Sequence, residues 1–461
     1  MNKRLGTTLF IFRRDLRLTD NLGLLFSLKN SSSVIPCFIF TPEQIENNAY
    51  RSDHCLRFMI ECLRDLQHQL QKRGGKLFLF QGNPAQIVEK CIAKAKVTSV
   101  VVNRDYTPYS KQRDAAIEQV AKERGAAFFS LDDCLLHRPE ESVKKDGRPY
   151  LVFTPFFRNI STHTVNKPKN IQRKNYFSGT ISFARSEAIF FHLLQKYSTK
   201  NSLIGGRREC IKILQNIKKL GEYSQHRNFP IKDYSTHLSP YLKFTVCSPR
   251  EIYWVIYSNL GKDHPLIRAL YWREFFTVIA FFFPYIFTGA FHKKWDKIKW
   301  SSDTNKFATW KMGKTGFPIV DAGMRELHKT GFISNRIRMI TASFLVKDLQ
   351  VDWRMGEKYF AEQLVDYDPS INNGNWQWIA GTGSAIQPYF QIFNPWLQQK
   401  KFDPECQYIK KWVPELARAS VTTIHHWYDK KYRSLDLKYV IPILDHEKAS
   451  AKAIARYQVL K

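Results

Sequence analysis

Acidic residues are scarce in this 461-residue sequence, where 41 Asp and Glu stand against 71 Lys and Arg and give a formal net charge of +30. An excess of one sign this large works against folding through self-repulsion. It therefore indicates a polyanionic partner, and nucleic acid is the first candidate. The alternative is a generically basic protein whose charge serves no specific partner.

Cysteine pairs and long apolar runs are also missing. None of the eight cysteines forms a Cys-x-x-Cys pair, so we predict no metal site and no disulfide framework but buried thiols in a reducing compartment. The most apolar run, VIAFFFPYIF (278–287), contains a proline and is too short to span a bilayer. The N-terminal stretch has only a short apolar run before further arginines, which is not typical of a signal peptide. We expect a cytoplasmic protein with no membrane partner.

The first 130 residues alternate short apolar runs with helical patterns. TLFIF, VIPCFIF, KLFLF and VTSVVV read as buried strands, whereas 52–74 and 111–125 carry apolar residues at helical spacing. Strands that alternate with helices predict an α/β fold with a doubly wound parallel sheet. No Gly-x-Gly-x-x-Gly follows the first strand, so this sheet is not expected to hold a dinucleotide in the usual way.

The remainder of the chain has a different character. Residues 131–200 lose the alternation, and NKPKNIQRKNYFSG (166–179) combines basic residues with helix breakers, as an exposed connection would. From 201 to 461 helical periodicity dominates. We therefore expect an α/β domain over 1–130, a connection over 131–200 and an all-helical domain over 201–461. The segments that fit a helix there are 209–226, 248–261, 266–282, 335–351 and 356–365.

One short segment, DYDPSINNGNWQWIAGTGS (366–384), concentrates acids, amides and indoles. Its pattern reads as a helix leading into Asp366, then a turn rich in Pro and Gly, then two tryptophans two residues apart. The flanks predict burial, and buried acids need partners. Arg336 and Arg338 interrupt an otherwise apolar helix and are the nearest candidates. The alternative is that these residues form only structural ion pairs and core contacts.

Seven motifs, in order along the chain, resemble those of the photolyase and cryptochrome flavoproteins, and most closely those of the bacterial class I cyclobutane pyrimidine dimer (CPD) photolyases. The motifs are FRRDLRLTDN (12–21), STHLSPYL (235–242), WREFF (272–276), GKTGFPIVDAGMREL (313–327), NRIRMITASFLVKDL (335–349), NNGNWQW (372–378) and PYFQIFNP (388–395). The resemblance implies an N-terminal α/β domain and a C-terminal helical domain that binds FAD in a folded conformation. It also implies a monomeric bacterial enzyme, a deoxyribodipyrimidine photolyase, that acts on UV-damaged DNA.

The resemblance assigns a set of residues to FAD. Small hydroxyls and backbone N–H groups at the start of a helix suit the pyrophosphate, and the Ser-Thr-His-Leu-Ser run keeps the hydroxyls although relatives more often read Thr-Ser-Arg-Leu-Ser. Asn372 is expected to face flavin N5, where an amide, unlike an acid, has no readily transferable proton and so favours repair by reduced anionic FAD. The assigned residues are Tyr223, Ser235, Thr236, His237, Leu238, Ser239, Arg273, Arg338, Asp366, Tyr367, Asp368 and Asn372.

The resemblance also assigns an electron route and a lesion site. Trp376, Trp353 and Trp300 match the family's tryptophan triad for photoreduction of the flavin, although core packing alone would also explain each of them. A lesion must be extruded from the duplex to reach a buried flavin, and indoles give it stacking contacts. The residues expected to contact the lesion or the DNA backbone are Arg227, Trp272, Asn335, Arg336, Met339, Trp378 and Gln398.

Two positions bear on the choice of lesion. Met339 occupies the place of a histidine that (6-4) photolyases use for proton transfer, so it favours light-driven repair of CPDs over the alternative, (6-4) repair. Ala269 departs from the family, because CPD enzymes usually have a glutamate there that bonds the bases of the dimer. Arg268 or a water molecule could take its place. A cryptochrome photoreceptor without repair activity is the alternative from another functional class.

A second, antenna chromophore is expected in the N-terminal domain near NRDYTPYSKQRD (103–114). The contacts typical of a folate are not evident here. The alternatives for this site are a folate, a deazaflavin, a flavin or no chromophore. The same stretch also fits a plain polar loop between a strand and a helix.

Overall fold

The computed structural model describes residues 5–46, 48–170, 172–181, 183, 186–197, 203–384, 391–433 and 436–459. The chain divides into two compact units. One contains Met1–Tyr150, Thr154–Lys219 and Thr236–Pro284, and the other contains Leu151–Phe153, Leu220–Ser235 and Tyr285–Lys461. Pro388–Phe390 of the PYFQIFNP motif lie outside the described residues.

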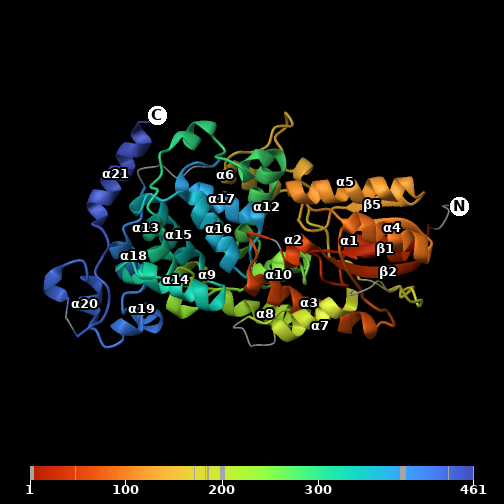
Figure 1. Cartoon of the computed structure of the whole chain (residues 1–461), viewed down its shortest axis with the longest axis horizontal. Helices are drawn as coiled ribbons and strands as arrows, with labels where there is room; N and C mark the ends of the chain where they lie inside the picture. The colour runs from red at the N-terminus through yellow and green to blue at the C-terminus, as the bar shows by residue number, and fades with distance from the viewer. Residues whose placement is uncertain are drawn as a thin grey trace. The chain divides into compact units, whose positions relative to one another are not determined.

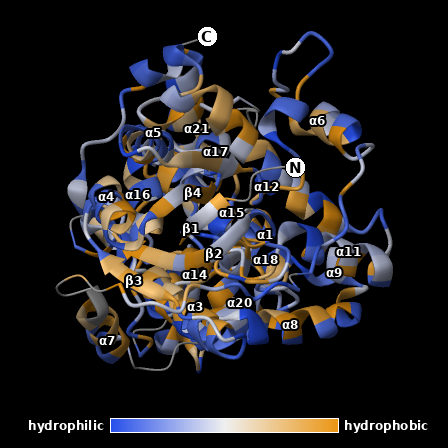
Figure 2. Cartoon of the chain, turned by 90° about the vertical axis from the view of Figure 1, so that its right-hand side faces the viewer, coloured by the Kyte–Doolittle hydropathy of each residue, from blue (hydrophilic) through white to orange (hydrophobic). Residues whose placement is uncertain are grey.

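The first unit is built around a five-stranded sheet in which every neighbouring pair is parallel (Figure 1). The strand order is β3-β2-β1-β4-β5, which confirms the predicted doubly wound sheet. The strands are β1 (Leu5–Phe12), β2 (Ser31–Phe40), β3 (Phe78–Gln81), β4 (Val97–Asn103) and β5 (Ala127–Leu131). Residues 8–12 of β1 are all buried, and Figure 2 shows the strands β1–β4 as largely hydrophobic.

Helices follow the strands and continue beyond the sheet. The helices of this unit are α1 (Leu22–Asn30), α2 (Pro42–Ile45), α3 (Asp53–Gln71), α4 (Pro84–Ala95), α5 (Pro108–Glu123), α6 (Phe153–Ile160), α7 (Ser186–Lys196), α8 (Arg207–Gln215), α10 (Ser239–Lys243), α11 (Pro249–Leu260) and α12 (Pro265–Phe282). Several of them, from α8 onward, come from the predicted helical domain but belong to the compact unit that contains the sheet. The domain boundaries drawn at residues 130 and 200 stay a prediction.

The sequence did not predict every strand and helix of this unit. Strand β5 is not among the predicted runs, because its residues are only partly buried or exposed and show no apolar stripe. Helices α1 and α4 were also not predicted. Both start at an asparagine whose side chain accepts from backbone N–H groups, Asn21 and Asn83, which is a recognisable helix signal.

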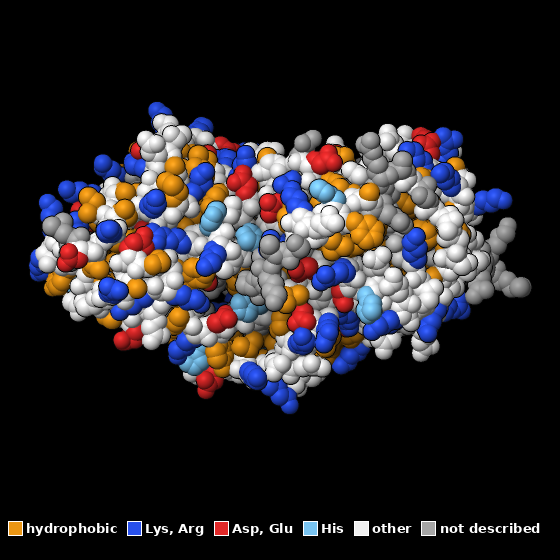
Figure 3. Space-filling model, turned by 60° about the horizontal axis from the view of Figure 1, so that its bottom comes forward, with side chains coloured by type: hydrophobic (Ala, Val, Ile, Leu, Met, Phe, Trp, Pro, Cys, Tyr) orange, Lys and Arg blue, Asp and Glu red, His pale blue; other side chains and the backbone are white. Residues whose placement is uncertain are grey.

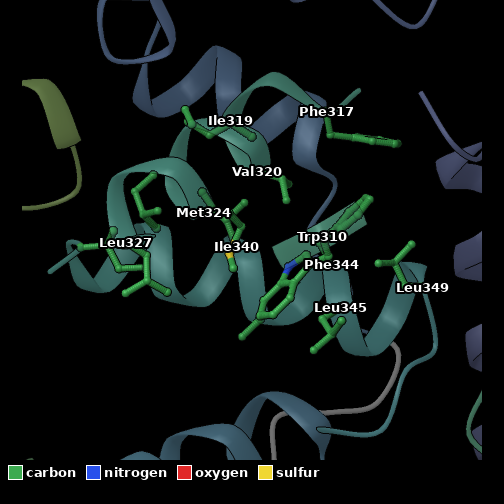
Figure 4. Packing of buried hydrophobic residues seen from close by; sticks show 14 of the residues in the cluster. Trp310, Phe317, Ile319, Val320, Met324, Leu327, Ile340, Phe344, Leu345 and Leu349 are labelled. Atoms are coloured by element: carbon green, nitrogen blue, oxygen red, sulfur yellow. The ribbon is translucent and has the colours of Figure 1, made fainter. Parts of the chain in front are cut away.

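The second unit is helical. It contains α9 (Tyr223–His226), α13 (Thr304–Lys311), α14 (Pro318–Thr330), α15 (Asn335–Ser343), α16 (Trp353–Gln363), α17 (Pro369–Ala380), α18 (Pro395–Phe402), α19 (Gln407–Trp412), α20 (Val421–His425) and α21 (His446–Gln458). Figure 4 shows part of its core, in which Trp310 packs among apolar side chains of α14, α15 and the turn after α15. No described helix combines the length and hydrophobicity needed to span a bilayer.

Two helix predictions and one turn prediction need correction. The stretch 209–226 is broken into α8, a 3-10 turn over Ile217–Leu220 and α9, because Gly221 and a run of lysines follow the apolar stripe. One helix was predicted over 335–351. The α-helix ends at Ser343, and a π-helical turn follows it over Phe344–Asp348. The turn predicted before the two tryptophans is helix α17, which accepts Pro369 in its first turn, where a missing N–H group costs nothing.

The eight cysteines are free thiols. All except Cys55 are buried, so Cys55 departs from the predicted burial. Lysine and arginine side chains spread over the face of the molecule shown in Figure 3, where acidic side chains are fewer. This face therefore shows the excess of basic over acidic residues that the sequence has.

Candidate functional site

Arg338 and Asp366 form an ion pair in the second unit. The guanidinium of Arg338 donates to Asp366 Oδ2 at 2.8 Å and, through Nε, to the carbonyl of Ile333 at 3.0 Å. The side chain of Asp366 is only 4% exposed, whereas that of Arg338 is 26% exposed. The pair therefore joins α15 to the loop before α17 and leaves part of the arginine accessible.

The other oxygen of Asp366 has no hydrogen-bond partner among the described residues, although it is buried. An unsatisfied buried carboxylate oxygen is costly. Two residues further on, Asp368 caps α17, because its Oδ1 accepts from the N–H groups of Ser370 and Ile371 at 3.1 and 3.3 Å. The capping bond fixes Asp368 at the start of the helix that carries the amides and indoles.

Asn372 lies on the first turn of α17 against helix α16. Its amide nitrogen donates to the carboxylate of Glu357 at 2.9 Å and to the backbone carbonyl of Glu357 at 3.0 Å. Burial raises the pKa of Glu357 to about 7, although the bond from Asn372 opposes the rise. Because an acceptor occupies the nitrogen side of the amide, Asn372 offers its carbonyl oxygen on the other side.

The three tryptophans of the predicted triad belong to, or pack against, one hydrophobic core cluster. Trp353 and Trp376 are buried in the core of the second unit, and Trp300 packs against that core while staying partly exposed. Ser301, next to Trp300, pairs with Val351, two residues before Trp353. A Cβ at Gly356 would lie 2.3 Å from the ring of Trp376, so this glycine lets α16 approach α17 closely.

The two guanidiniums of Arg227 and Arg336 are close enough to affect each other. Burial and the charge of Arg227 lower the pKa of Arg336. Arg336 donates to the neutral side chain of Asn228 at 3.2–3.3 Å and lies over the ring of Phe402 at 4.4 Å. Arg336 is therefore not the partner of Asp366, and a pair of neighbouring cations suits an anion such as a phosphate.

Most of the remaining predicted residues of this unit are partly buried. The exposed Asn335 contacts the sulfur of Met339 at 3.5 Å, and the ring of Tyr223 lies 5.6 Å from the guanidinium of Arg227. A buried side-chain oxygen of Gln398 has no partner among the described residues. The partly buried residues among them are Tyr223, Ser235, Met339, Tyr367, Trp378 and Gln398.

The first unit holds the other predicted residues. In the run 236–239, the hydroxyl of Thr236 accepts from the N–H of Leu238 at 3.2 Å, His237 has a positive φ of 50°, and Ser239 begins α10. A strained backbone of this kind is often found where a ligand binds. On α12, Arg273 is buried beside Glu274 with a separation of 3.4 Å, and Trp272 stacks on Phe276 at 5.5 Å.

Ala269 is exposed one turn before Trp272. Its neighbour Arg268 is also exposed, and its guanidinium lies 5.1 Å from the ring centre of Phe157. Position 269 therefore offers no carboxylate in place of the glutamate that the resemblance leads one to expect there. The cation of Arg268 is the charged group that this stretch offers instead.

These observations fit FAD. The ion pair with one unsatisfied buried oxygen offers an acceptor for a ring N–H group, and the Asn372 carbonyl offers another. The run 236–239 supplies hydroxyls and backbone N–H groups of the kind that bind phosphates. The sequence reasoning missed Glu357, although a glutamate four residues after Trp353 and three before Phe360, on the apolar stripe of a helix, is a recognisable signal.

The comparisons with known proteins agree along the chain. Residues 8–172 match the DNA photolyase family model, and residues 266–459 match the FAD binding domain of DNA photolyase. A deoxyribodipyrimidine photo-lyase of Alkalihalophilus pseudofirmus is 34% identical over 468 residues, which covers 97% of each chain.

Solved structures give the same result. An archaeal photolyase from Sulfolobus tokodaii, determined with two FAD molecules, is 39% identical with a TM-score of 0.87 and covers 98% of this chain and 100% of its own. A bacterial class III photolyase from Agrobacterium tumefaciens is 32% identical with a TM-score of 0.89, over 100% of this chain and 98% of its own. The chain therefore belongs to the photolyase and cryptochrome family, with a parallel-sheet N-terminal domain and a helical FAD-binding domain.

Proposed function

We propose that this protein repairs cyclobutane pyrimidine dimers in UV-damaged DNA by using light and FAD. The observation that carries the proposal is the Arg338–Asp366 pair with its unsatisfied carboxylate oxygen, in a chain that matches deoxyribodipyrimidine photo-lyases over nearly its whole length. FAD, when bound and reduced, would supply the light-driven electron needed to open the cyclobutane ring.

The residues of the chain hold and orient the cofactor. Asp366 would accept from the ring edge of the cofactor through its second oxygen, while Arg338 holds the carboxylate in place. Asp368 would support the pyrimidine edge of the flavin. Asn372 would offer its carbonyl oxygen to the N5 side, because its amide nitrogen already donates to Glu357. The remaining cofactor contacts in the proposal are Tyr223, Ser235, Thr236, His237, Leu238, Ser239, Arg273 and Tyr367.

Other residues bind the damaged strand. Arg227 and Arg336 neutralise backbone phosphates, with Gln398 as a further polar contact, and Trp272 and Trp378 stack on the extruded bases. Met339 supports a preference for CPDs, because it cannot transfer a proton and opening the cyclobutane ring requires none. Trp376, Trp353 and Trp300 would pass electrons toward the flavin during photoreduction.

Lesion choice tests the proposal. Protein with chemically reduced FAD is illuminated with oligonucleotides that contain one CPD or one (6-4) photoproduct, and the repaired strands are quantified. Repair of the CPD alone is expected. Repair of the (6-4) lesion alone would replace the proposed substrate, and repair of neither lesion by protein with bound FAD would indicate a photoreceptor.

A further inference from the structure

Helix α11 presents a cluster of three aromatic side chains at the surface of the first unit. Tyr257 follows Tyr253 by four residues and Trp254 by three, so its ring lies beside both. The ring centres of Tyr253 and Tyr257 are 5.9 Å apart in a stacked arrangement, and those of Trp254 and Tyr257 are 5.1 Å apart. Tyr257 is 38% exposed, and the other two are partly buried. The two neighbours therefore support an exposed ring at the surface.

A basic segment contacts this cluster. The ammonium of Lys167 lies 3.2 Å from the centre of the Trp254 ring, and the indole N–H donates to the carbonyl of Asn166 at 3.1 Å. A cation over an indole is an attractive contact. Two adjacent residues therefore hold the connecting segment against α11.

The charge of this connecting segment is of one sign. Residues 147–186 contain seven Lys and Arg and no Asp or Glu. On α11 the acid is Glu251, which pairs with Arg207 at 2.6 Å, and Asp263 follows in the next loop. The aromatic cluster thus lies beside a segment with an excess of basic side chains, which suits a polyanion.

The same segment also contacts α12. Phe157 of α6 contacts Tyr271 with ring centres 5.4 Å apart, and the exposed Arg268 lies over Phe157 at 5.1 Å. Burial and the nearby Tyr253 raise the pKa of Tyr271, so α11 and α12 meet at these rings. Arg268 precedes Trp272, a proposed lesion contact, by one helical turn. Basic and aromatic groups therefore continue from α11 to the helix that carries this tryptophan.

We propose that Lys167, Tyr253, Trp254, Tyr257 and Arg268, together called the α11 surface, bind an unpaired segment of a DNA strand. Aromatic rings stack on bases of any sequence while cations neutralise the phosphates, and single-strand binding uses both kinds of contact. Cations alone would suit a duplex equally well. The aromatic cluster favours a single strand, because a duplex keeps its base faces stacked inside. The inference goes beyond the proposed function, since binding here requires no lesion, light or flavin.

Binding of an undamaged single strand tests the α11 surface. The full chain with bound FAD is added in the dark to a labelled oligothymidylate of about 16 nucleotides, and fluorescence anisotropy gives the affinity. Tyr257→Ala should weaken binding about fivefold or more, because one base loses its stacking partner. Lys167→Gln should lower the slope of log affinity against log salt by about 0.7, as one phosphate contact on a single strand predicts. Tyr50→Ala, which removes a tyrosine of similar exposure (39%) outside the α11 surface, should bind like the wild type.

Two further variants separate stacking from folding. Tyr257→Phe keeps a ring and should keep the affinity, whereas Tyr257→Leu keeps only an apolar side chain and should lose it. Circular dichroism shows whether each variant is folded. Equal single-strand affinity in folded Tyr257→Leu and wild-type protein overturns the inference.

A duplex of the same length identifies the kind of partner. Its affinity should be the same for Tyr257→Ala and the wild type, because paired bases cannot stack on the ring. A loss as large as that for the single strand would indicate a general phosphate surface and overturn the inference. Tyr257→Ala should also repair a dimer in a duplex at the wild-type rate. If wild-type protein repairs no dimer but Tyr257→Ala loses single-strand affinity, the proposed function fails and the α11 surface stands.

Discussion

The carboxylate of Asp366 bonds Arg338 through one oxygen and leaves the other buried without a partner among the described residues. A hydrogen bond to a charged group contributes about 1.5–3 kcal/mol. Replacing Asp366 with Asn should therefore weaken FAD binding by about 10- to 100-fold. Fluorescence titration of the apoprotein with FAD measures the change. Glu415→Gln, which removes the charge from the Arg325–Glu415 pair, is the control, and equal affinity for both variants would contradict the assignment.

The contact between Asn372 and Glu357 predicts a pH-dependent loss of stability in Asn372→Asp. Two carboxyl groups would then face each other, and one must stay protonated or repel the other. The melting temperature should fall most above pH 7, where Glu357 with its pKa of about 7 loses its proton. Adding Glu357→Gln should remove this pH dependence. Asn373→Asp is the control, because Asn373 donates to the carbonyl of Ile286, and an equal pH dependence there would refute the coupling.

The burial of Lys347 predicts that the free energy of unfolding of the wild-type protein rises with pH, unlike that of Asn372→Asp. Its pKa is lowered from 10.5 to about 7 in the folded chain, so the unfolded chain binds more protons between pH 7 and 10.5 and stability rises with pH in that window. Below pH 7 the full cost of the buried charge remains. Lys347→Met should raise the free energy of unfolding near pH 6.5 by about 1–4 kcal/mol. Urea unfolding at pH 6.5 and 9.5 measures this, and an equal effect at both values would contradict it.

Much of the fold could be predicted because burial leaves a plain pattern. The apolar runs of β1–β4 cannot avoid the interior, whereas β5 at the sheet edge is half-exposed and leaves no such signal. Helix α17 was read as a turn because Pro369 and Gly374 usually break helices. Only the capping role of Asp368 makes that proline a first-turn residue.

The candidate site could be predicted less completely. The resemblance gave Arg338 and Asp366, and the structure adds the ion pair between them. Glu357 was missed because no single motif contains both it and its partner, and Asn372 lies 15 residues from Glu357. Contacts of this kind come from packing, which one sequence does not reveal.

Because the guanidiniums of Arg227 and Arg336 are neighbours, we predict that removing either one weakens the salt dependence of DNA binding. Each phosphate contact that is removed should lower the slope of log affinity against log salt by about 1. Arg336→Ala and Arg227→Ala should therefore bind undamaged duplex DNA more weakly at low salt and with shallower slopes. Fluorescence anisotropy across a salt series measures this. Arg148→Ala, at an exposed pair with Asp146, serves as the control, and identical slopes in all variants would rule out these phosphate contacts.

Trp300→Phe should stop photoreduction but preserve repair. Phenylalanine is much harder to oxidise than tryptophan, so the route from the surface is interrupted while the lesion site is untouched. Absorption spectra under blue light with an external reductant follow the flavin, and protein reduced chemically with dithionite should repair dimers at the wild-type rate. Trp412→Phe, a partly buried tryptophan on α19, should photoreduce normally. A loss of repair in chemically reduced Trp300→Phe would argue for a different role.

One experiment decides whether light, flavin and lesion repair belong together in this chain. Protein with bound, chemically reduced FAD is mixed with an oligonucleotide that contains a single cyclobutane dimer, and intact strands are counted after equal times in blue light and in darkness. We predict repair in the light, none in the dark, and none in light from protein that has been stripped of its flavin. If the amount of dimer in the oligonucleotide does not fall in blue light, although the protein still holds reduced FAD, the proposed function is contradicted.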